Sequence, residues 1–397
     1  MISYPRWLED TTDAPRLRLL GIGNAGIHIA DRITKRSELT IDTVALNSDQ
    51  HSLNSSTAGT RIALGPMTTH GLGAGGDAET GLDAAKESLQ EILGAIDGAD
   101  IIFLCAGLGG GTGGPTAALV AKLAKERGAL PVAIVTSPFL FEGRRRKSQA
   151  TEALDELRKY ADAIVHFEND RMADFSEPCQ DAAKTFAACD DLLAGAITTL
   201  THAVKGGGPL PVSLPDLISI LRHSGDGCLF GSGSAKGDER AELALDELLR
   251  SPLLEGGQLL KDAAELLVNI HGPSTVSFLE VSKIMQGISK HIAAKTNLHL
   301  TLSAIDENAP LTIALIGRTG SPEFTRHVQD LVSTQQPAAP KPVVEETNTK
   351  PKPTPQKAHQ EDLPLEPIAK GRFDKSEPTM YEGEDLDVPT FIRRKLL

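Results

Sequence analysis

Short apolar runs alternate with amphipathic segments along the first part of the chain. Apolar runs bounded by turn signals predict buried strands, and the segments with helical periodicity between them predict crossover helices. Strands that alternate with helices indicate a parallel sheet covered by helices on both faces. The predicted strands are 16–23, 41–47, 101–106, 131–136 and 163–168. The predicted helices are 25–36, 80–96, one from Pro115 and 146–160. A polar, glycine-rich stretch follows residue 47.

A long helix is predicted over residues 179–204, and it ends at the triple glycine Gly206–Gly208. The pattern beyond it predicts a smaller α/β unit that begins with a helix after Pro215. Its predicted strands lie near 227–232, 265–271, 297–304 and 311–317, and its predicted helices near 238–250 and 278–293.

The composition shifts from about Ser333 to Pro, Lys, Glu, Gln and Thr. Such a segment buries too little apolar surface to offset the entropy of ordering, so we predict a disordered linker. The apolar residues return in the final stretch. The predicted organisation is an arm at 1–15, a nucleotide-binding domain at 16–178, a central helix at 179–205, a C-terminal α/β domain at 206–332, a linker at 333–384 and a terminal peptide at 385–397.

Charge and cysteine content narrow the class of protein. A net charge of −13 argues against a nucleic-acid partner, because such a protein would present a basic face. The four cysteines show no C-x-x-C spacing, which favours reduced thiols over disulfides or a metal site. No apolar run approaches about 18 residues, so we expect a cytoplasmic protein that does not insert into a membrane.

The stretch CAGLGGGTGGPTAALVAKL carries the strongest chemical signal. An apolar strand ends in glycines 109–111, followed by Thr112, Gly113 and Gly114, and Pro115 is predicted at the first helical position. Glycines leave backbone N–H groups uncovered, and the N-terminus of the next helix favours an anion. The sequence therefore predicts a phosphate-binding turn, which is not of the Walker type because no GK[ST] follows.

Two further glycine turns compete for interpretation. The first strand ends in GIGNAG, residues 21–26, which is a G-x-G-x-x-G pattern with Asp49 as a possible ribose ligand. This pattern alone would fit a dinucleotide-dependent oxidoreductase or a simple tight turn. A third loop, GLGAGG at 71–76, argues against the dinucleotide interpretation. Three glycine turns on one sheet edge suit the phosphates of a single nucleotide better than the pyrophosphate of a dinucleotide.

Several motifs in order resemble the FtsZ family, the bacterial relatives of tubulin that polymerise on GTP. The resemblance covers roughly residues 16–320 and the last dozen. GGGTGGP at 109–115 is similar to the family signature, GLGAGG at 71–76 to its γ-phosphate loop and TSPFLFEG at 136–143 to a third motif. SPLL at 251–254 and VNI at 268–270 match later landmarks. The resemblance implies a tubulin-like fold and GTP or GDP as ligand, with Mg²⁺ held by the phosphates and water.

The resemblance also implies a role for particular residues. The glycine turns would hold phosphates, Glu142 and Arg146 would contact the sugar side, and Asn169, Phe186 and Asp191 would bind guanine. Taken alone, Asn169 is typical of a turn and Asp191 of a solvated helix face. The full implied set is Gly21, Gly23, Asn24, Gly26, Asn47, Ala74, Gly75, Gly109, Gly110, Gly111, Thr112, Gly113, Glu142, Arg146, Asn169, Phe186 and Asp191.

The chain departs from the family pattern where hydrolysis is concerned. The family completes its active site with an NxDxxD loop from the next subunit of a head-to-tail filament, and this chain has PVSLPD at 211–216. Asp216 keeps the last acid, while Ser213 replaces the first. Loss of a water-positioning group commonly costs on the order of 10²–10³ in rate, so we expect slow GTP hydrolysis. Gly114, Pro115 and His28 also differ from the family residues.

The terminal peptide DVPTFIRR resembles the family's adaptor-binding motif. The resemblance implies self-association and a membrane-adaptor division protein of FtsA or ZipA type as partner, at the mid-cell division site. The contacts would come from Asp387, Pro389, Phe391, Ile392 and Arg393. The leading hypothesis is a polymerising GTPase of the bacterial division ring. The alternative is a hydrolysis-deficient paralogue that serves as a structural or regulatory copolymer, which the PVSLPD loop favours.

Overall fold

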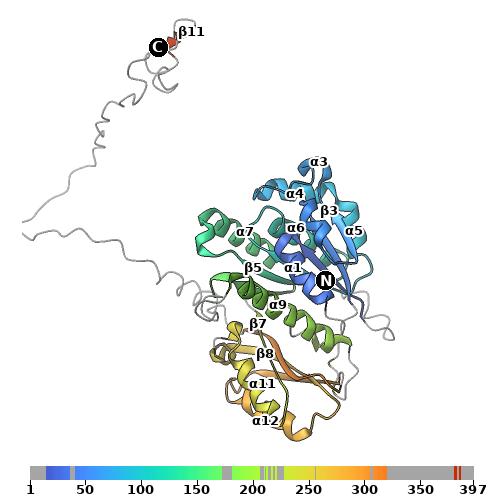
Figure 1. The fold of residues 1–397 in the computed structure, drawn as a ribbon, viewed down its shortest axis with the longest axis vertical. Helices are drawn as coiled ribbons and strands as arrows, with labels where there is room; N and C mark the ends of the chain where they lie inside the picture. Colours follow the sequence, from blue (N-terminus) through green and yellow to red (C-terminus); the bar gives the residue numbers. More distant parts are fainter. Residues whose placement is uncertain are drawn as a thin grey trace, which may run out of the picture. The chain divides into compact units, whose positions relative to one another are not determined.

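Figure 1 shows a computed structural model of the chain. It describes residues 15–35, 41–171, 181–205, 228–254, 256–304 and 307–319, together with the separate positions 210, 212, 216, 217, 220, 380, 381, 384 and 385. The chain divides into two units, residues 1–336 and 337–397. In the second, β11 (Met380–Tyr381) pairs antiparallel with β12 (Glu384–Asp385).

A six-stranded parallel sheet forms the first half of the first unit, in the order β3-β2-β1-β4-β5-β6. Because every strand runs the same way, all carboxyl ends meet at one edge of the sheet. This confirms the predicted parallel α/β fold. The strands are β1 (Leu17–Ile22), β2 (Asp42–Asn47), β3 (Thr60–Ala63), β4 (Ile101–Gly107), β5 (Leu130–Ser137) and β6 (Ala163–Glu168).

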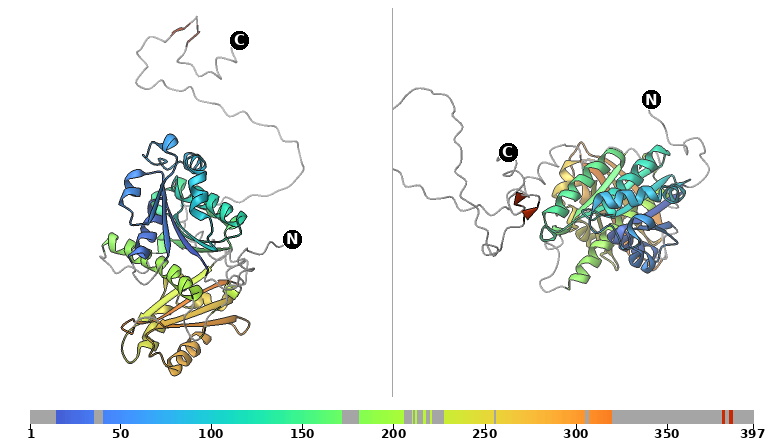
Figure 2. Two further views of the ribbon diagram at one scale, coloured as in Figure 1. Left: turned by 90° about the vertical axis from the view of Figure 1, so that its right-hand side faces the viewer. Right: turned by 90° about the horizontal axis from the view of Figure 1, so that it is seen from above.

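Helices cover both faces of this sheet (Figure 2). Successive strand residues point to opposite faces, so Leu19 and Phe103 enter one core cluster, and Leu20 and Leu104 enter another. The first cluster is closed by α1 and α9, and the second by α4, α5, α6 and α7. The helices of this half are α1 (Gly23–Thr34), α2 (Gln50–Ser55), α3 (Pro66–Thr69), α4 (Ala78–Glu87), α5 (Leu89–Ile96), α6 (Gly113–Glu126), α7 (Arg144–Tyr160) and α9 (Ala182–Lys205).

The long helix α9 connects the two halves of the unit. Its buried side chains Leu193 and Ile197 share one core cluster with strands of the first sheet and with Phe230 of the second sheet. A helix that is apolar around much of its circumference is buried on several sides, which fits a central helix between two sheets.

The second sheet is mixed, in the order β7-β10-β8-β9, with β10 antiparallel to β7 and β8, and β8 parallel to β9. Two helices pack on it through a third core cluster that includes Leu248 and Ile284. The elements are β7 (Cys228–Ala235), β8 (Ala263–Gly272), β9 (Asn297–Ala304), β10 (Leu311–Thr319), α11 (Arg240–Leu249) and α12 (Phe278–Ser289). Short 3₁₀ turns are η2 (Leu140–Glu142), η3 (Asn169–Arg171), η4 (Pro252–Leu254) and η5 (Gln258–Asp262).

In the polar, glycine-rich stretch after residue 47, where the sequence predicted no element, the structure has α2, β3 and α3. Two local predictions were wrong. The predicted helix 80–96 is broken at Ser88, whose hydroxyl accepts from the N–H of Gly65 and donates to the carbonyl of Ala63. Pro115 is the third residue of α6, not the first. Its missing N–H still costs nothing, because the first four N–H groups of a helix have no partner within it.

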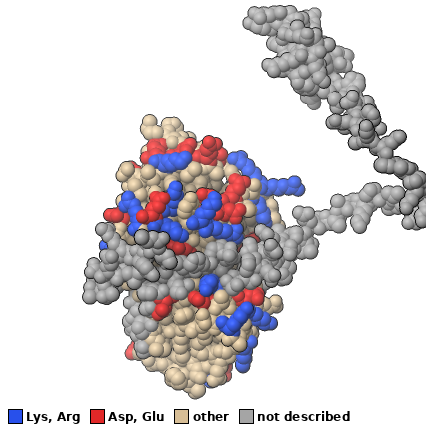
Figure 3. Space-filling view, turned by 180° about the vertical axis from the view of Figure 1, so that it is seen from behind, with Lys and Arg blue, Asp and Glu red and all other residues tan. Residues whose placement is uncertain are grey.

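Several predictions fall partly or wholly outside the described residues. These include the start of the central helix, the triple glycine, the linker and the terminal peptide, so the predicted domain boundaries stay predictions. Within the described part of the chain, no helix is long and apolar enough to cross a membrane. On the face shown in Figure 3, charges of both signs are interspersed over the upper part, whereas the lower part carries few of them.

Candidate functional site

The candidate site lies at the carboxyl edge of the six-stranded sheet. The segments that follow β1, β2, β4, β5 and β6 all leave from this edge, since those strands are parallel neighbours. Ligands in open α/β sheets bind at the carboxyl ends of strands. The site is built from the segments that follow these five strands and from the loop at 71–77, which follows α3.

The loop after β4 is the predicted phosphate turn. The strand ends at Gly107 and α6 begins at Gly113. A Cβ at Gly113 would lie 2.4 Å from the carbonyl oxygen of Gly107, so only glycine fits there. A Cβ at Gly110 would meet nothing within 4 Å. The turn is therefore closely packed at its base and open at Gly110, with the N-terminus of α6 below it.

The turn after β1 packs directly on this loop. A Cβ at Gly26 would lie 2.0 Å from the carbonyl oxygen of Cys105, and one at Gly23 would lie 3.3 Å from the nitrogen of Gly113. Gly21 is similarly confined by Ala30. The glycines of the GIGNAG pattern thus bring α1 close to β4, and the predicted adjacency of the two glycine turns is observed.

Two side-chain pairs join the loop after β2 to its neighbours. Asn47 Nδ2 donates to Asn24 Oδ1 at 2.7 Å, and the hydroxyls of Ser48 and Thr112 lie 2.6 Å apart. The side chain of Asp49 caps α2 by accepting from the N–H groups of His51 and Ser52. That cap accounts for Asp49 without the ribose contact that the dinucleotide interpretation required.

The loop at 71–77 closes over the phosphate turn. A Cβ at Gly111 would lie 2.8 Å from Cβ of Ala74 and 2.7 Å from the carbonyl oxygen of Asp77. Asp77 caps α4, and hydrogen bonds from Thr80 hold the pKa of its carboxyl below the ordinary value. Gly75 lies two residues before Asp77 in the same loop, and a Cβ at Gly75 would meet nothing within 4 Å. Gly75 and Gly110 are thus two glycines of this site with room for an approaching ligand.

The segment after β5 carries the predicted sugar-side residues. Glu142 accepts from the N–H of Phe139 at 2.9 Å and forms an ion pair with Arg146 one helical turn later. Arg145 and Gln149 of α7 donate to the carbonyl oxygen of Gly76 at 3.3 and 3.2 Å. These bonds fix α7 beside the loop at 71–77, so Glu142 and Arg146 lie at the same edge as the phosphate turn.

The predicted base-binding residues come from the segment after β6 and from α9. Phe186 packs edge-on against Phe139, with ring centroids 5.6 Å apart. Asn169 begins the 3₁₀ turn after β6, and its Oδ1 is buried without a hydrogen-bond partner. A buried acceptor left unpaired is costly, so this oxygen fits a donor brought by a ligand. This orphaned atom supports the predicted role of Asn169.

Asp191 lies on α9 and faces α1. Arg32 Nη1 donates to both of its carboxylate oxygens, and Arg32 also lies 3.9 Å from Asp190. Burial raises the pKa of Asp190 to about 6, against the lowering effect of His28 and Arg32 and with a further raising effect of Asp191. The two acids and two basic side chains form one charged cluster between the helices.

The structure does not place the predicted catalytic residues in this site. Asp216 is described as an exposed helical residue, and Ser213 lies outside the described residues. The terminal-peptide residues at 387–393 also lie outside them. Among the residues that the structure describes, no three His, Cys, Asp or Glu side chains form a group that could hold a metal ion.

Sequence reasoning missed three side chains that shape the site. Ser48 pairs with Thr112, Gln149 holds the loop at 71–77, and Arg32 binds Asp191. Arg32 lies one turn after His28 on α1, but that spacing does not indicate its partner, which is 159 positions away on α9. Ser48 and Gln149 carry no local sequence signal, because their partners are distant in the chain.

The arrangement offers backbone donors, open glycines and a helix N-terminus at one end, and an aromatic ring with amide and carboxylate acceptors at the other. Such a site suits a nucleotide with several phosphates and a base that presents donors. Residues 16–177 match the family model described as Tubulin/FtsZ family, GTPase domain, and residues 227–314 match FtsZ family, C-terminal domain.

Solved structures agree with these matches. An FtsZ dimer from M. jannaschii is 31% identical, with a TM-score of 0.70, over 79% of this chain and 90% of that one. A GTPγS-bound protofilament of CetZ2 from Haloferax volcanii is 23% identical, with a TM-score of 0.64, over 80% of this chain and 99% of that one. The second likeness supports the fold alone. With both family models matched in order on this nucleotide-binding edge, the chain belongs to the tubulin/FtsZ family.

Proposed function

We propose that this protein is a GTPase that polymerises head to tail into filaments of the bacterial division ring. The observation that carries the proposal is the phosphate turn at 108–113, packed against the loop at 71–77 and open at Gly110 and Gly75. Phosphate oxygens would take the backbone N–H groups of this turn, and the macrodipole of α6 would favour their charge. GTP and GDP are the expected ligands.

Guanine is the base that the other end of the site supports best. Asp191 offers a carboxylate that accepts hydrogen bonds, and the N1–H and 2-amino group of guanine form a matching pair of donors. Adenine lacks that pair. Phe186 offers a ring for stacking, and the orphaned Oδ1 of Asn169 lacks a donor. These three side chains would hold the base, while Glu142 and Arg146 would contact the sugar side.

Apolar side chains exposed at two separate places support self-association. Leu72 and Phe141, beside the nucleotide edge, are 85% and 81% exposed. Phe278 and Leu279, at the start of α12, are 87% and 67% exposed. Exposed apolar patches mark interaction sites. Exposed apolar side chains on two different parts of one molecule suit a heterologous contact, which generates an open filament when the rotation does not close.

Hydrolysis is proposed to be slow. In the head-to-tail arrangement, Asp216 of one subunit would act at the γ-phosphate bound by the next, and Ser213 would stand where the family has an acid. Phosphoryl transfer depends mainly on positioning and on charge stabilisation. A loop with one acid in place of two would therefore leave binding and polymerisation intact and lower the turnover. Mg²⁺ would be held by the phosphates and water.

The second candidate function is a structural copolymer that binds GTP without hydrolysing it. The PVSLPD loop at 211–216 favours it, because only Asp216 remains of the usual acids. Phosphate release from GTP, measured against protein concentration with pelleting of the same samples, separates the two. Release that begins at the polymerisation threshold supports the GTPase, whereas polymer without phosphate release supports the copolymer.

The role of Asp216 is tested by Asp216→Ala, with Asp238→Ala as the matched loss of an exposed acid in the same half of the unit. We expect Asp216→Ala to lower phosphate release per polymerised subunit on the order of tenfold or more, with pelleting retained. Asp238→Ala should leave both unchanged. Equal phosphate release by wild type and Asp216→Ala would exclude the proposed composite site.

The terminal peptide is proposed to bind a membrane-adaptor division protein of FtsA or ZipA type, at the mid-cell site in the cytoplasm. Phe391 and Ile392 would enter an apolar groove, and Arg393 would contact its acidic rim. Phe391→Ala in the full chain should abolish recruitment of filaments to adaptor-coated vesicles while pelleting with GTP is unchanged. Unchanged recruitment would contradict this assignment.

A further inference from the structure

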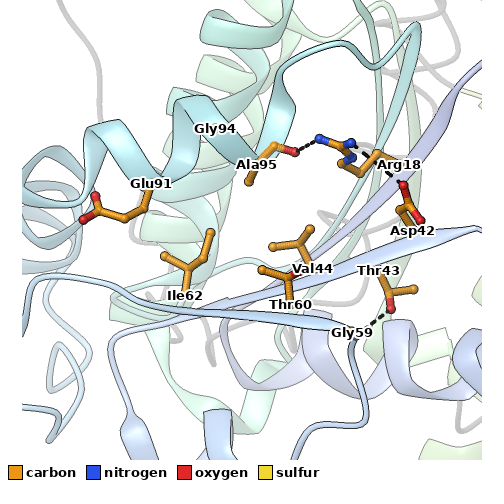
Figure 4. Close-up of a pocket in the computed structure, with 10 residues that line it drawn as sticks. All are labelled: Arg18, Asp42, Thr43, Val44, Gly59, Thr60, Ile62, Glu91, Gly94 and Ala95. Atoms are coloured by element: carbon orange, nitrogen blue, oxygen red, sulfur yellow. Dashed lines mark hydrogen bonds and ion pairs between the residues drawn. The ribbon is translucent and has the colours of Figure 1, made fainter.

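A cavity of about 490 Å³ opens at the amino-terminal edge of the six-stranded sheet, away from the nucleotide edge (Figure 4). It lies between α5 and the first residues of three strands: Arg18 is the second residue of β1, Asp42 the first of β2 and Thr60 the first of β3. Cavities of this size accommodate a large side chain or a small ligand.

The floor of this groove is apolar and continuous with a core cluster. Val44 and Ala95 are buried, and Ile62 is partly exposed while it packs on the same cluster. The groove is open on the α5 side at Gly94, which has no side chain and where a Cβ would meet nothing within 4 Å. An apolar floor that remains open beside an edge strand is a place where a further apolar side chain would gain burial.

Charged side chains lie at both ends of the groove, a carboxylate at one end and a guanidinium with the Asp42 carboxylate beside it at the other. Glu91 projects from α5 at one end, and Arg18 lies at the other (Figure 4). Arg18 is held in place because its Nη1 donates to the carbonyl oxygens of Ala95 at 2.6 Å and Asp97 at 3.1 Å. Its ion pair with Asp42 is long, at 3.9 Å. A fixed guanidinium beside an apolar floor suits an aromatic ring.

The chain itself enters the sheet at this same edge. The main-chain N–H of Arg16 donates to Asp100 Oδ2 at 2.8 Å, directly before β1 begins at Leu17. Residues 1–14 precede this point and lie outside the described residues. They contain Tyr4, Trp7 and Leu8, and Trp7 is the single tryptophan of the protein. An extended chain spans about 3.3 Å per residue, so the nine residue steps from Trp7 to Arg16 reach up to about 30 Å.

We propose that the N-terminal segment folds back on its own domain and places Trp7 in this groove. Arg6 lies beyond Trp7, toward the Glu91 end, where the two side chains have opposite charge. Glu9 and Asp10 lie between Trp7 and the start of β1, toward the end that holds Arg18 together with Asp42. The indole covers Val44, Ile62 and Ala95 and stacks on the guanidinium of Arg18.

Trp7 is also the reporter for the test, since the full-length protein has no other tryptophan. Its emission and its quenching by acrylamide are measured in wild type, in Gly94→Leu and in the control Gln286→Leu. Gly94→Leu extends a side chain from α5 into the groove, its Cβ meets nothing within 4 Å, and leucine has the higher helix propensity. Gln286→Leu adds the same side chain to an exposed position of α12.

We expect Trp7 in wild type and in Gln286→Leu to emit at shorter wavelength and to be quenched severalfold less than in a peptide of residues 1–15. Gly94→Leu should shift the emission to longer wavelength and raise the quenching to the peptide value. A fully quenched Trp7 in wild type overturns the proposal. Protection that survives Gly94→Leu also overturns it, because the segment would then dock elsewhere.

A second variant leaves the groove residues untouched. Trp7→Ala, in a segment that precedes the folded domain, should speed amide hydrogen exchange in α5 and β3 severalfold and leave α11 and α12 unchanged. Equal exchange of α5 and β3 in wild type and Trp7→Ala contradicts docking in this groove. Neither measurement uses GTP or filaments, so its outcome is independent of the proposed function.

Discussion

Arg32 on α1 donates from a single nitrogen, Nη1, to both carboxylate oxygens of Asp191 on α9, at 3.2 and 3.1 Å. The two side chains are 34% and 47% exposed. The carboxylate proposed to read guanine is therefore oriented by a neighbouring helix before any ligand is present. Each carboxylate oxygen has a second lone pair, so Asp191 can accept from a base while Arg32 stays in place.

We predict that Arg32→Ala weakens binding of GTP and GDP alike. The variant loses the orientation of Asp191 and leaves two adjacent acids without their common cation. Because the pair is partly exposed, the loss is about 0.5–1 kcal/mol, which corresponds to a two- to fivefold higher Kd. Titration of a fluorescent GTP analogue, with GDP competition, measures it.

Arg127→Ala is the matched control, since Arg127 forms an exposed ion pair with Asp97 at the far end of α6. Its nucleotide affinity should equal that of wild type. If Arg32→Ala bound both nucleotides as tightly as wild type, Asp191 would not depend on Arg32 for its orientation. If Arg127→Ala weakened binding equally, the effect would come from net charge.

Gly110 and Gly26 are both in glycine turns, but they are predicted to respond differently to a methyl group. Gly110→Ala places its Cβ in open space, so the free energy of unfolding should change by less than about 0.5 kcal/mol. The same methyl lies where phosphate would approach the turn, so GTP affinity should fall about tenfold, the loss of one charge-assisted hydrogen bond. Urea unfolding and GTP titration check the two parts.

Gly26→Ala is expected to give the reverse pattern. Its Cβ would lie 2.0 Å from the carbonyl oxygen of Cys105, which is backbone and cannot move aside cheaply. We expect a loss of about 3 kcal/mol in the free energy of unfolding. A stable Gly26→Ala protein, or a Gly110→Ala protein that binds GTP normally, would show that the open and packed glycines have been assigned wrongly.

The core of the parallel sheet could be predicted because its strands are buried on both faces. Residues 101–106 are all buried, and the sequence there is apolar without interruption. The edge strand β3 could not be predicted, because it is short and three of its four residues are exposed, Ile62 being the exception. Ser88 interrupts a pattern that is helical by periodicity, through bonds to residues more than 20 positions away.

The residues of the candidate site divide in the same way, into those that the sequence locates and those that only the packing reveals. The glycine turns and Asn169 could be located because loops after parallel strands share one edge and the family motifs mark them. The role of Arg32 could not, because a basic residue on a helix is usually solvated and only the packing of α1 on α9 brings it to Asp191.

His271 on β8 is predicted to make the protein less stable in acid. Its ring stacks on His202 of α9 with centroids 5.0 Å apart. Burial, and then the charge of His202, lowers the pKa of His271 to about 3, whereas an unfolded histidine has a pKa of about 6.5. The unfolded state therefore binds the proton first. The stabilising contribution is present above about pH 6.5 and is lost as the pH falls toward 3.

Urea unfolding at pH 7 and pH 5 measures this effect. In wild type, the titration of His271 should lower the free energy of unfolding by about 2 kcal/mol between pH 7 and pH 5. The raised pKa of Asp190 has the opposite effect, because the folded state then binds that proton more readily. His271→Phe keeps a stacked ring without titration and should remove most of the His271 share. His51→Phe, at an exposed position of α2, should leave the pH dependence of wild type. An unchanged slope in His271→Phe would contradict the prediction.

Phe278 is predicted to form part of the contact between subunits. It is the first residue of α12, where Ser277 and Glu280 form a capping box and Arg240 binds Glu280 at 2.6 Å, so the backbone that presents this exposed ring is fixed. Burying a phenylalanine side chain contributes roughly 1.5–3 kcal/mol. Phe278→Ser should therefore raise the GTP-dependent polymerisation threshold by about tenfold or more, read by pelleting. Because Phe278 lies on α12 and not on the nucleotide-binding edge, GTP affinity should be unchanged, and this separates a lost contact from a lost site. A variant that pellets at the wild-type threshold would place the filament contact on another face.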